Sequence, residues 1–511
     1  MHADVKMSTG IDLADAVRSV MSVAPQAPAM EYAGRWWKWA DLSEVMAALA
    51  VRLEEAGLGR GARLGCLMRN RPEVAATILG AFSSGRCIVT LNAHYPETRL
   101  AAEIEDLRLP VVIGTAEDWA RPELAAATGK MGCLALELPN RPGEPVRALG
   151  RGSRAADACA YAAGVAIEML TSGTTGPPKR IALQALALER AIDSAARYDS
   201  RSTDSAARLR SGVQILNAPF AHISGVFALL NCITAGRMSC LLDRFSVRAW
   251  VDAVRRHRPK VAGAPPAALR MILDANVPKE DLQSLVAFRT GTAPLDPDLA
   301  NAFLARYGIP VLQNYGATEF AGGVAGWTLD DFQAHGKDKR GAVGRLNAGI
   351  EARIVDPETA APQPGLTRGL LQLRAPHLGD GVQWVSTNDI GTLDSDRFLW
   401  IHDRHDSAII RGGFKVFPED IVRALEQHSA VMEAAAVGLP DPRLGRVPAA
   451  AYRLREGFPE PAADELESFL RARLLPYQLP TRLIRLEDFP RTPSMKVSLP
   501  QLAAILSGQS S

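Results

Sequence analysis

The sequence predicts an α/β protein with two domains of unequal size. Residues 1–404 alternate segments of helical and strand periodicity, which is the pattern of parallel strands joined by helices. Residues 405–511 hold two strand patterns and a helix pattern, enough for a small α+β domain. With 511 residues, 47% of them apolar, the chain is long enough to bury a core in each domain.

The first elements are marked by periodicity and by helix-boundary residues. A helix is predicted from Asp41, which has Glu44 three residues on as in a capping box, to Gly57. Its apolar face would consist of Leu42, Val45, Met46, Leu49 and Leu53. A strand is predicted over 63–68 (RLGCLM), a helix from Pro72, and a second strand over 87–92 (CIVTLN).

The later segments predict a connection, a boundary and the elements of the small domain. The stretch 138–158 is rich in Gly, Pro, Ser and Arg, which favours a surface connection. The run RFLWIHDRHD (397–406) ends an apolar strand in a charged cluster, so we place the domain boundary at Arg404–Asp406. Beyond it we predict a strand at 434–441, a helix at 463–474 and a strand at 482–489.

Charge and cysteine usage exclude several classes of protein. The net charge is +2 and the basic residues are spread along the chain, which argues against nucleic-acid binding and a polybasic membrane anchor. No apolar run reaches the roughly 18 residues of a membrane span, and the N-terminus lacks a signal core. The six cysteines form no CxxC pair, so we expect reduced, mostly buried thiols in a cytoplasmic protein. The nine histidines are not spaced as metal ligands, so no metal cluster is predicted.

The segment LTSGTTGPPKR (170–180) predicts a phosphate-binding loop. Consecutive backbone N–H groups near glycines form a concave anion site, hydroxyls add donors, and a lysine adds positive charge. The predicted ligands of a polyphosphate are Thr171, Ser172, Gly173, Thr174, Thr175, Gly176 and Lys179. The alternative is a flexible linker, but apolar flanks on both sides favour a tight loop inside a domain. It is not a Walker P-loop, because Gly-x-x-x-x-Gly-Lys-Ser/Thr does not occur here.

This loop and seven further segments, in the same order, resemble the motifs of the adenylate-forming superfamily of acyl-CoA and aryl-CoA synthetases, adenylation domains and luciferases. The segments are APFAHISG (218–225), GTAPL (291–295), NYGATE (314–319), GAVGRLNAGIEARIVD (341–356), TNDIG (387–391), DRHDSAIIRGGFKVFPEDI (403–421) and PRTPSMK (490–496). The resemblance covers nearly the whole chain. It implies a large N-terminal adenylate-forming domain and a small, mobile C-terminal domain.

The resemblance also implies a two-step reaction. A carboxylate attacks the α-phosphate of ATP, giving an acyl-adenylate and pyrophosphate, and the thiol of coenzyme A then displaces AMP. Negative charge develops on oxygen in both steps, so oriented donors and Mg²⁺ are needed. We therefore expect ATP, Mg²⁺ and coenzyme A as cofactors and a small-molecule carboxylic acid as substrate.

Roles are implied for the residues at the motif positions. The adenine site would be lined by Gly291, Thr292, Ala293, Asn314, Tyr315 and Gly316. Thr318 would bind the α-phosphate, and Glu319 would be the Mg²⁺ ligand, since carboxylate oxygen suits this ion. Asp389 and Arg404 would bind the ribose hydroxyls. Outside this context, Tyr315 would be interpreted as a core residue and the charged pair as surface residues.

Three further segments would serve catalysis and domain movement. His222 would form a wall of the acyl site and gate the thiol tunnel, the alternative being an ordinary core histidine. Asp406 is the expected hinge, and Gly412 and Gly413 would line the pantetheine path after rotation, unless they form an ordinary glycine turn. Lys496 would polarise the α-phosphate and the carboxylate in the first step only.

Three positions depart from the family pattern. Asn388 stands in place of a glycine before Asp389, and Ser407 in place of a frequent Asp. Met495 replaces the glycine before Lys496, where a Cβ would stiffen or redirect the loop.

The substrate is predicted only as a class. The segment PFAHISGV (219–226) has no Asp to pair with an α-amine, so an amino acid is not expected. Small residues in FAGGVAG (320–326), with apolar walls from Phe220, Val226 and Phe227, favour a bulky apolar acid: aryl, alicyclic or medium-chain. Arg237 and Arg289 remain candidates for binding a second carboxylate.

The sequence therefore predicts an ATP-dependent acyl-CoA synthetase that does not bind nucleic acid and has no membrane span. Three alternatives stay open: a ligase that loads a separate carrier protein, a catalytically impaired nucleotide-binding regulator motivated by Met495, and a kinase, which lacks its P-loop motif. Coenzyme A is the simpler acceptor, because no carrier domain follows Lys496. A homodimer is left open.

Overall fold

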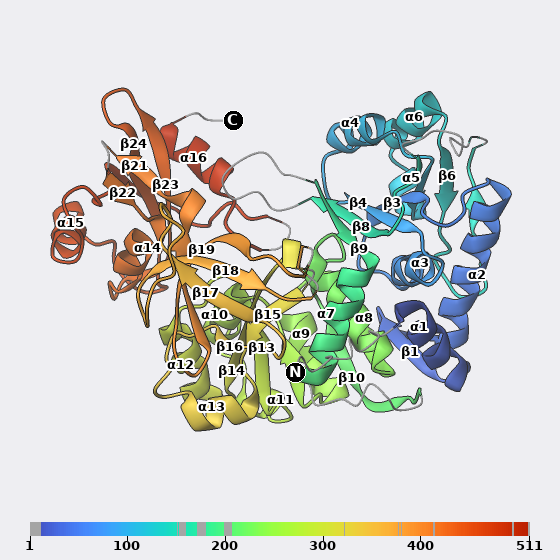
Figure 1. Cartoon of the computed structure of the whole chain (residues 1–511), viewed down its shortest axis with the longest axis horizontal. Helices are drawn as coiled ribbons and strands as arrows, with labels where there is room; N and C mark the ends of the chain where they lie inside the picture. The colour runs from blue at the N-terminus through green and yellow to red at the C-terminus, as the bar shows by residue number, and fades with distance from the viewer. Residues whose placement is uncertain are drawn as a thin grey trace, which may run out of the picture. The chain divides into compact units, whose positions relative to one another are not determined.

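The computed structural model describes residues 12–150, 152, 160–170, 180–198, 207–320, 322–376, 378–379, 381–411, 414–492 and 495–508. These residues form two compact units (Figure 1). The first takes the residues up to 351 together with 374–383, and the second takes 352–373 and those from 384 onward. The predicted boundary at Arg404–Asp406 falls inside the second unit and stays a prediction.

A seven-stranded sheet forms the N-terminal part of the first unit, in the order β7-β6-β5-β3-β4-β8-β9. Its strands are β3 (Arg63–Met68), β4 (Cys87–Asn92), β5 (Val111–Gly114), β6 (Leu134–Glu137), β7 (Arg147–Ala148), β8 (Val165–Leu170) and β9 (Arg180–Gln184). The inner pairs are parallel and the edge strands β7 and β9 pair antiparallel. Every residue of β4 is buried, as expected for a parallel strand covered on both faces. The strands predicted at 63–68 and 87–92 are confirmed.

The helices of this part are α1 (Leu13–Val23), α2 (Trp39–Glu55), α3 (Pro72–Ser83), α4 (Glu97–Leu107), α5 (Ala116–Trp119) and α6 (Pro122–Met131). Helix α3 begins at Pro72 as predicted. The start of α2 was predicted two residues late: Asp41 is not its N-cap but its third residue, and its carboxylate accepts a 2.7 Å hydrogen bond from the Lys38 N–H. The fully buried Trp39 places the helix start against the core.

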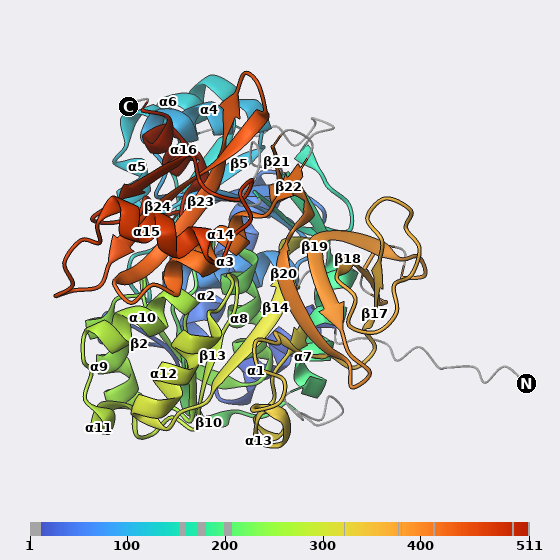
Figure 2. The same ribbon diagram turned by 90° about the vertical axis from the view of Figure 1, so that its left-hand side faces the viewer.

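Two further sheets complete the first unit. A four-stranded sheet, ordered β10-β11-β1-β2, consists of β1 (Pro28–Tyr32), β2 (Arg35–Lys38), β10 (Arg210–Leu216) and β11 (Arg237–Leu241). The run β12-β13-β14-β15-β16 consists of β12 (Val261–Gly263), β13 (Ala287–Thr290), β14 (Val311–Ala317), β15 (Gly322–Gly326) and β16 (Gly344–Leu346). The helices here are α7 (Ala185–Tyr198), α8 (Ile223–Thr234), α9 (Val247–His257), α10 (Pro266–Asp274), α11 (Lys279–Leu282), α12 (Pro297–Tyr307) and α13 (Leu329–His335). Figure 2 shows α9, α10 and α12 beside β13 and β14.

The second unit begins with the strand run β20-β19-β18-β17. Its bounds are β17 (Glu351–Val355), β18 (Gly369–Arg374), β19 (Val385–Leu393) and β20 (Phe398–Arg404). A mixed sheet follows, formed by β21 (Ile409–Arg411), β22 (Phe414–Val416), β23 (Val431–Asp441), β24 (Gly445–Leu454) and β25 (Arg482–Arg485). Three helices belong to it: α14 (Pro418–Glu426), α15 (Ala463–Arg471) and α16 (Leu499–Ser507). The predicted elements are present, although α15 and β25 end earlier than predicted.

Strand β23 supplies two hydrophobic cores from its two faces. Ala434 and Ala436 pack with residues of α14 and α15, while Ala435 and Val437 pack with residues of α16. This alternation follows from the two-residue period of a strand. The α/β class, with a small α+β C-terminal part, is therefore confirmed.

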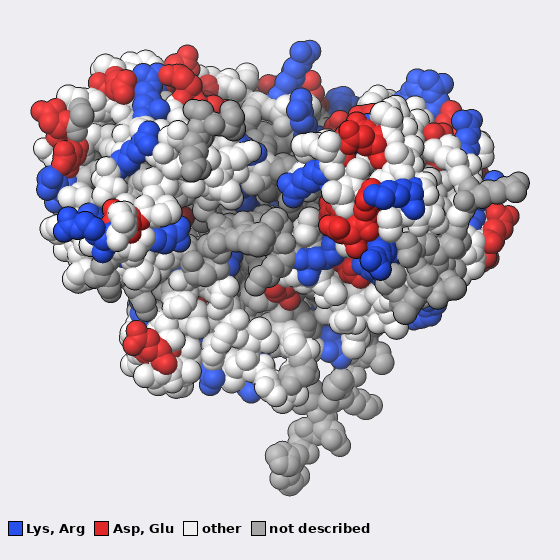
Figure 3. Space-filling view, turned by 90° about the horizontal axis from the view of Figure 1, so that it is seen from above, with Lys and Arg blue, Asp and Glu red and all other residues white. Residues whose placement is uncertain are grey.

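Surface and thiol features are also defined over the described residues. Five cysteines, Cys66, Cys87, Cys133, Cys232 and Cys240, are buried free thiols, as predicted, and Cys159 lies outside the described residues. None of the described helices combines the length and apolarity needed to cross a bilayer. On the face drawn in Figure 3, basic and acidic side chains are interspersed.

Glu73 provides a pH-dependent test of this fold. It lies in the first turn of α3 and is 2% exposed, and burial, reinforced by the charge of Asp118, raises the pKa of its carboxyl to about 7. The native state therefore keeps a proton that the unfolded chain loses near pH 4.3. The free energy of unfolding consequently falls as pH rises from about 4.3 to about 7. We expect Glu73→Gln to raise the free energy of unfolding by about 2–3 kcal/mol at pH 8 and to have little effect at pH 4.

The measurement is the shift in Tm from pH 4 to pH 8. The matched control is Glu123→Gln, because Glu123 also follows a helix-opening proline but is exposed. A gain for Glu73→Gln that is the same at both pH values would show that the carboxyl does not hold its proton.

Candidate functional site

The predicted adenine-site residues of the first unit follow two neighbouring strands. Gly291, Thr292 and Ala293 come directly after β13, and Asn314, Tyr315 and Gly316 lie on β14. The two strands are parallel, with Thr290 opposite Gln313. Their carboxyl ends therefore meet at one edge of the sheet, where open α/β sheets bind ligands. The structure brings these two segments together.

The contact between the two segments requires a glycine. A Cβ on Gly291 would lie 2.4 Å from Asn314 Oδ1 and 2.9 Å from the Asn314 carbonyl oxygen. The next residue, Thr292, has a φ of 69°, a left-handed backbone that is rare for a β-branched residue. Such strain persists only where surrounding structure imposes it, and it is concentrated at functional sites.

The end of β14 turns sharply into the predicted phosphate and metal ligands. A register shift between Tyr315 and Gly316 interrupts the pairing of β14 with β15, and a 3₁₀ turn, η2 (Thr318–Phe320), follows. Phe320 is buried and its ring lies 6.3 Å from that of Tyr315. Tyr315 is only half-buried and Glu319 is exposed, so neither is a core residue. An exposed carboxylate at this position can bind a hydrated Mg²⁺ ion.

His222 is the N-cap residue of α8, and the loop before it is fixed by a buried side chain. Asn70 is 3% exposed; its amide group donates to the carbonyl oxygens of Ala218 (3.1 Å) and Leu242 (3.0 Å). Its side-chain oxygen accepts from the Phe220 N–H at 2.9 Å. The sequence analysis missed Asn70, whose only signal is a polar residue soon after a predicted strand.

A glycine also shapes the turn at His222. A Cβ on Gly225 would lie 2.2 Å from the Pro219 carbonyl oxygen, so this turn closes only around a glycine. The six-residue separation of Pro219 and Gly225 in the segment PFAHISG is therefore explained by this close contact.

The predicted acyl segment, β15, lies against α8. A Cβ on Gly322 would come within 2.9 Å of Phe227 Cε2, whereas a Cβ on Gly323 would meet nothing closer than 3.6 Å. Of the three apolar walls predicted, Phe220 and Val226 are fully buried in the hydrophobic core, and Phe227 is partly exposed. Phe227 and Gly323 are therefore the residues of this set best placed to contact a substrate.

In the second unit the predicted ribose ligands are cross-strand neighbours. Asp389 on β19 lies opposite Arg404 on β20. Thr387, 6% exposed, fixes this part of β19: its hydroxyl donates to the Leu371 carbonyl at 2.9 Å and accepts from the Asp389 N–H at 3.0 Å. Asn388 lies in the strand without a positive φ, so its replacement of the family's glycine causes no backbone strain.

The segment at the predicted hinge is tied together by Asp403, which the sequence analysis did not single out. Its carboxylate accepts hydrogen bonds from the Arg404 N–H (2.6 Å) and the Ser407 hydroxyl (2.7 Å). Burial raises the pKa of Asp403, although these hydrogen bonds oppose the shift. Ser407, where the family often has an Asp, therefore has a defined partner. The backbone of Asp406 lies in the short turn η3 (His405–Ser407), and its role as a hinge stays a prediction.

Lys496 lies in a hydrogen-bonded turn between Arg491 and Val497. The Thr492 N–H donates to the Lys496 carbonyl at 2.7 Å, and the Met495 N–H donates to the Thr492 carbonyl at 2.8 Å. Met495 has a φ of 65°, the conformation that a glycine would adopt without strain. Arg491 adds a further hydrogen bond by donating to the Met495 carbonyl at 3.2 Å.

The charge of Lys496 is affected by its surroundings. Burial lowers the pKa of its amino group, and the positive charge of Arg404 lowers it further. The charge of Arg404, the cross-strand partner of Asp389, thus acts on the Lys496 amino group.

The phosphate-loop residues Thr171, Ser172, Gly173, Thr174, Thr175, Gly176 and Lys179, and the glycines Gly412 and Gly413, lie outside the described residues. Their roles stay predictions.

Comparison with known proteins gives matches over nearly the whole chain. A family model described as AMP-binding enzyme matches residues 17–382, and one described as AMP-binding enzyme C-terminal domain matches residues 423–496. The 4-coumarate–CoA ligase 3 of Oryza sativa subsp. japonica is 29% identical over 93% of this chain and 88% of its own. The fatty acid–[acyl-carrier-protein] ligase ScoC of Streptomyces coeruleorubidus is 27% identical over 93% and 92%. The solved structure of the ATP-bound RpMatB-BxBclM chimera B3 has a TM-score of 0.81 at 25% identity, covering 96% of this chain and 98% of its own.

Replacing Met495 tests whether the turn before Lys496 is strained. Valine is more strongly disfavoured in a left-handed backbone than methionine, so Met495→Val should weaken the turn by on the order of 1 kcal/mol. Hydrogen exchange at the amides of residues 495 and 496, which both donate to Thr492, should then be roughly fivefold faster. Met495→Gly removes the strain but adds backbone freedom, so it should change exchange less. The amides of α16 are the internal control, and equal protection in Met495→Val and the parent would contradict a strained turn.

Proposed function

The chain belongs to the AMP-binding enzyme family, and we propose that it is an ATP-dependent acid–CoA ligase with a functional adenylation site. The observation that supports this most directly is that the charge of Arg404, the cross-strand partner of Asp389, lowers the pKa of the Lys496 amino group. A lysine that this charge reaches can donate to the α-phosphate of a nucleotide whose ribose is bound by the Asp–Arg pair.

In the first step, a carboxylate oxygen of the acid attacks the α-phosphorus of ATP, and the bond to the pyrophosphate oxygen breaks. Negative charge accumulates on the α-phosphate, where Lys496 and the Thr318 hydroxyl would donate. Mg²⁺ neutralises phosphate charge in such reactions, and Glu319 would hold it through its exposed carboxylate. In the second step, the thiol of coenzyme A attacks the acyl carbon and AMP leaves.

The partial burial of Lys496 is suited to the first step. Burial makes its charge costly in the absence of a phosphate and strengthens the attraction when an anion is bound, because the effective dielectric constant is low. The interaction is therefore strongest when charge develops on the phosphate, which is the condition for lowering a reaction barrier.

The proposed acid is bulky and apolar, with an aryl acid as the leading case. Phe227 beside Gly322 supplies an apolar wall, and Gly323 leaves space next to Asn314 and Tyr315. The rice relative is named for 4-coumarate, an aryl acid, which is consistent with this class.

Two alternatives remain for the proposed function. The relative named as a fatty acid–[acyl-carrier-protein] ligase keeps a carrier-protein acceptor open, and comparing coenzyme A with a carrier protein in one assay separates the two. A regulator without catalysis, suggested by Met495, is less favoured, because the turn that presents Lys496 is intact. The cytoplasmic location, the homodimer and the mobility of the C-terminal part stay predictions.

The first test is pyrophosphate release over a panel of carboxylic acids, with and without coenzyme A. We expect aryl, alicyclic or medium-chain acids to support release and coenzyme A to accelerate turnover. Gly323→Leu should shift the preference toward smaller acids by at least tenfold in kcat/KM, since about 1.4 kcal/mol of steric cost suffices, and KM for ATP should change little. Gly129→Leu, at a site where a Cβ meets nothing within 4 Å, is the control. An unchanged acid profile would remove Gly323 from the acyl site.

The second test separates the two half-reactions. Loss of a donor that acts on the developing charge costs on the order of 10²–10³ in rate, so Lys496→Ala should slow adenylate formation by that factor. Thioester formation from supplied acyl-adenylate and coenzyme A should be nearly unchanged. Lys130→Ala, at an exposed lysine of α6, is the control. Equal damage to both half-reactions, or to neither, would contradict the role proposed for Lys496.

A further inference from the structure

Glu31, Cys240 and His257 form a cluster away from the residues discussed above. Strands β1 and β11 run parallel, and their register places Glu31 directly opposite Cys240. His257 is the last residue of α9, and its Nε2 shares a hydrogen bond with Glu31 Oε2. One potential ligand atom from each of the three residues lies within 4.8 Å of the others.

From this geometry we propose that Glu31, Cys240 and His257 bind a zinc ion. Zinc takes thiolate, imidazole and carboxylate ligands at roughly 2.0–2.3 Å, which separates tetrahedral ligands by roughly 3.3–3.8 Å. The three candidate ligand atoms already lie within 4.8 Å of one another, close to this range. Because the three ligands come from β1, β11 and α9, a bound ion would link β1 to two elements about 200 residues further along the chain.

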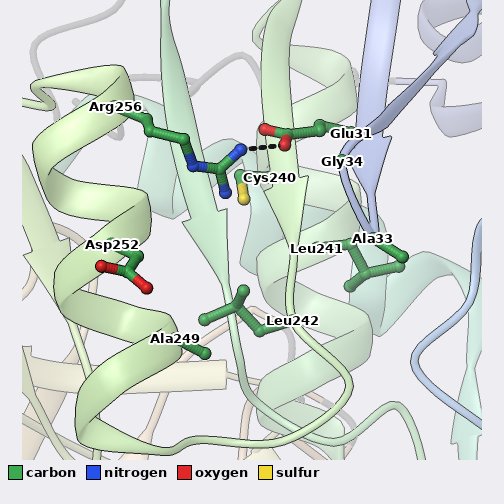
Figure 4. Close-up of a pocket in the computed structure, with 9 residues that line it drawn as sticks. All are labelled: Glu31, Ala33, Gly34, Cys240, Leu241, Leu242, Ala249, Asp252 and Arg256. Atoms are coloured by element: carbon green, nitrogen blue, oxygen red, sulfur yellow. Dashed lines mark hydrogen bonds and ion pairs between the residues drawn. The ribbon is translucent and has the colours of Figure 1, made fainter.

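The cluster is buried but has an access route. Glu31 and Cys240 are 3% and 2% exposed, and the side chain of His257 is 11% exposed. Glu31 and Cys240 line a pocket with a volume of about 350 Å³, which also includes Asp252 and Arg256 (Figure 4). The pocket has room for an ion with a water molecule as the fourth ligand.

The charges in the cluster suit a cation that binds by displacing protons. Burial alone would raise the pKa of Glu31, but hydrogen bonds and the charges of Arg256 and His257 outweigh it, so the carboxylate stays ionised. Burial and the neighbouring Glu31 raise the pKa of the Cys240 thiol to about 12. Zinc binds cysteine as the thiolate and histidine through a ring lone pair, so binding would release the thiol proton to solvent and use the lone pair of His257 Nε2. A thiolate and a carboxylate together balance the charge of Zn²⁺.

Arg256 is the competitor for Glu31. It donates to Glu31 Oε1, but its side chain is 50% exposed, so it can turn outward at small cost. Asp252 lies four residues earlier on α9 and lines the same pocket, which gives the guanidinium a second carboxylate to pair with. Figure 4 shows Arg256 directed at Glu31, with the Cys240 sulfur close by and Asp252 on the same helix.

The ligand set distinguishes this ion from the Mg²⁺ of the proposed reaction. Thiolate and imidazole ligands select zinc, whereas Mg²⁺ prefers oxygen ligands and retains water. The cluster should therefore bind zinc in the presence of excess Mg²⁺.

The probe for the test is Co²⁺, which replaces zinc in such sites and shows an intense near-ultraviolet band when a thiolate is bound. The full-length, chelator-treated protein is titrated with Co²⁺ in excess Mg²⁺. We expect one equivalent to bind with the thiolate band, and Zn²⁺ to remove the band by displacement. Cys240→Ala should abolish the band, and Cys232→Ala, at another fully buried cysteine, should retain it. No stoichiometric binding, or a band that survives in Cys240→Ala, would overturn the proposal.

A second variant tests the competition. Arg256→Gln removes the charge that pairs with Glu31, so zinc affinity measured against a chelator should rise at least tenfold. An affinity that does not rise would show that Arg256 and the ion do not compete for Glu31, and would overturn the proposal. Thermal unfolding of each variant without metal controls for folding, and His257→Gln, which should lower affinity, provides an independent check if Cys240→Ala is unstable.

Discussion

Close approach of backbone to backbone is the constraint on which the candidate site of the first unit depends. A Cβ on Gly291 would lie only 2.4 Å from Asn314 Oδ1, and a Cβ on Gly316 would lie only 2.3 Å from the Gly322 carbonyl oxygen. These contacts bring the end of β13 against β14 and the end of β14 against β15. The positions of Asn314, Tyr315 and Thr318 therefore depend on Gly291 and Gly316, which have no side chain to keep the strands apart.

Each of the two units contains backbone strain that a glycine would have avoided. Thr292 and Met495 both have positive φ values, and each directly neighbours a residue with a predicted role. At Met495 the strain is offset by the hydrogen bonds that close the turn around Thr492. A strained turn that is held by several hydrogen bonds cannot relax without breaking them together. It therefore restricts the position of a neighbouring side chain more than a flexible loop would.

Much of this architecture could be predicted, and the exceptions share a cause. Strands β3 and β4 and the start of α3 follow from local periodicity and from Pro72, which act within a few residues. The family motifs indicated the sites around Tyr315, Asp389 and Lys496. Asn70 was missed because its partners lie 148 to 172 residues away, and hydrogen bonds over such separations, unlike helix caps, leave no local sequence pattern. The Glu31 and Cys240 pairing was invisible for a similar reason, since it arises from the register of two strands far apart in the chain.

The two cores on either side of β23 determine where genes for two related proteins can be joined to make a chimera. All residues of both cores lie after Ser407, between Ile409 and Leu506. A crossover between two related genes placed between β20 and β21 would therefore leave each of these cores within a single parental sequence. The segment that carries Lys496 can then be exchanged as a unit. Both parents must have residues that reproduce the hydrogen bonds that Asp403 accepts from Arg404 and Ser407, because these bonds span the crossover point.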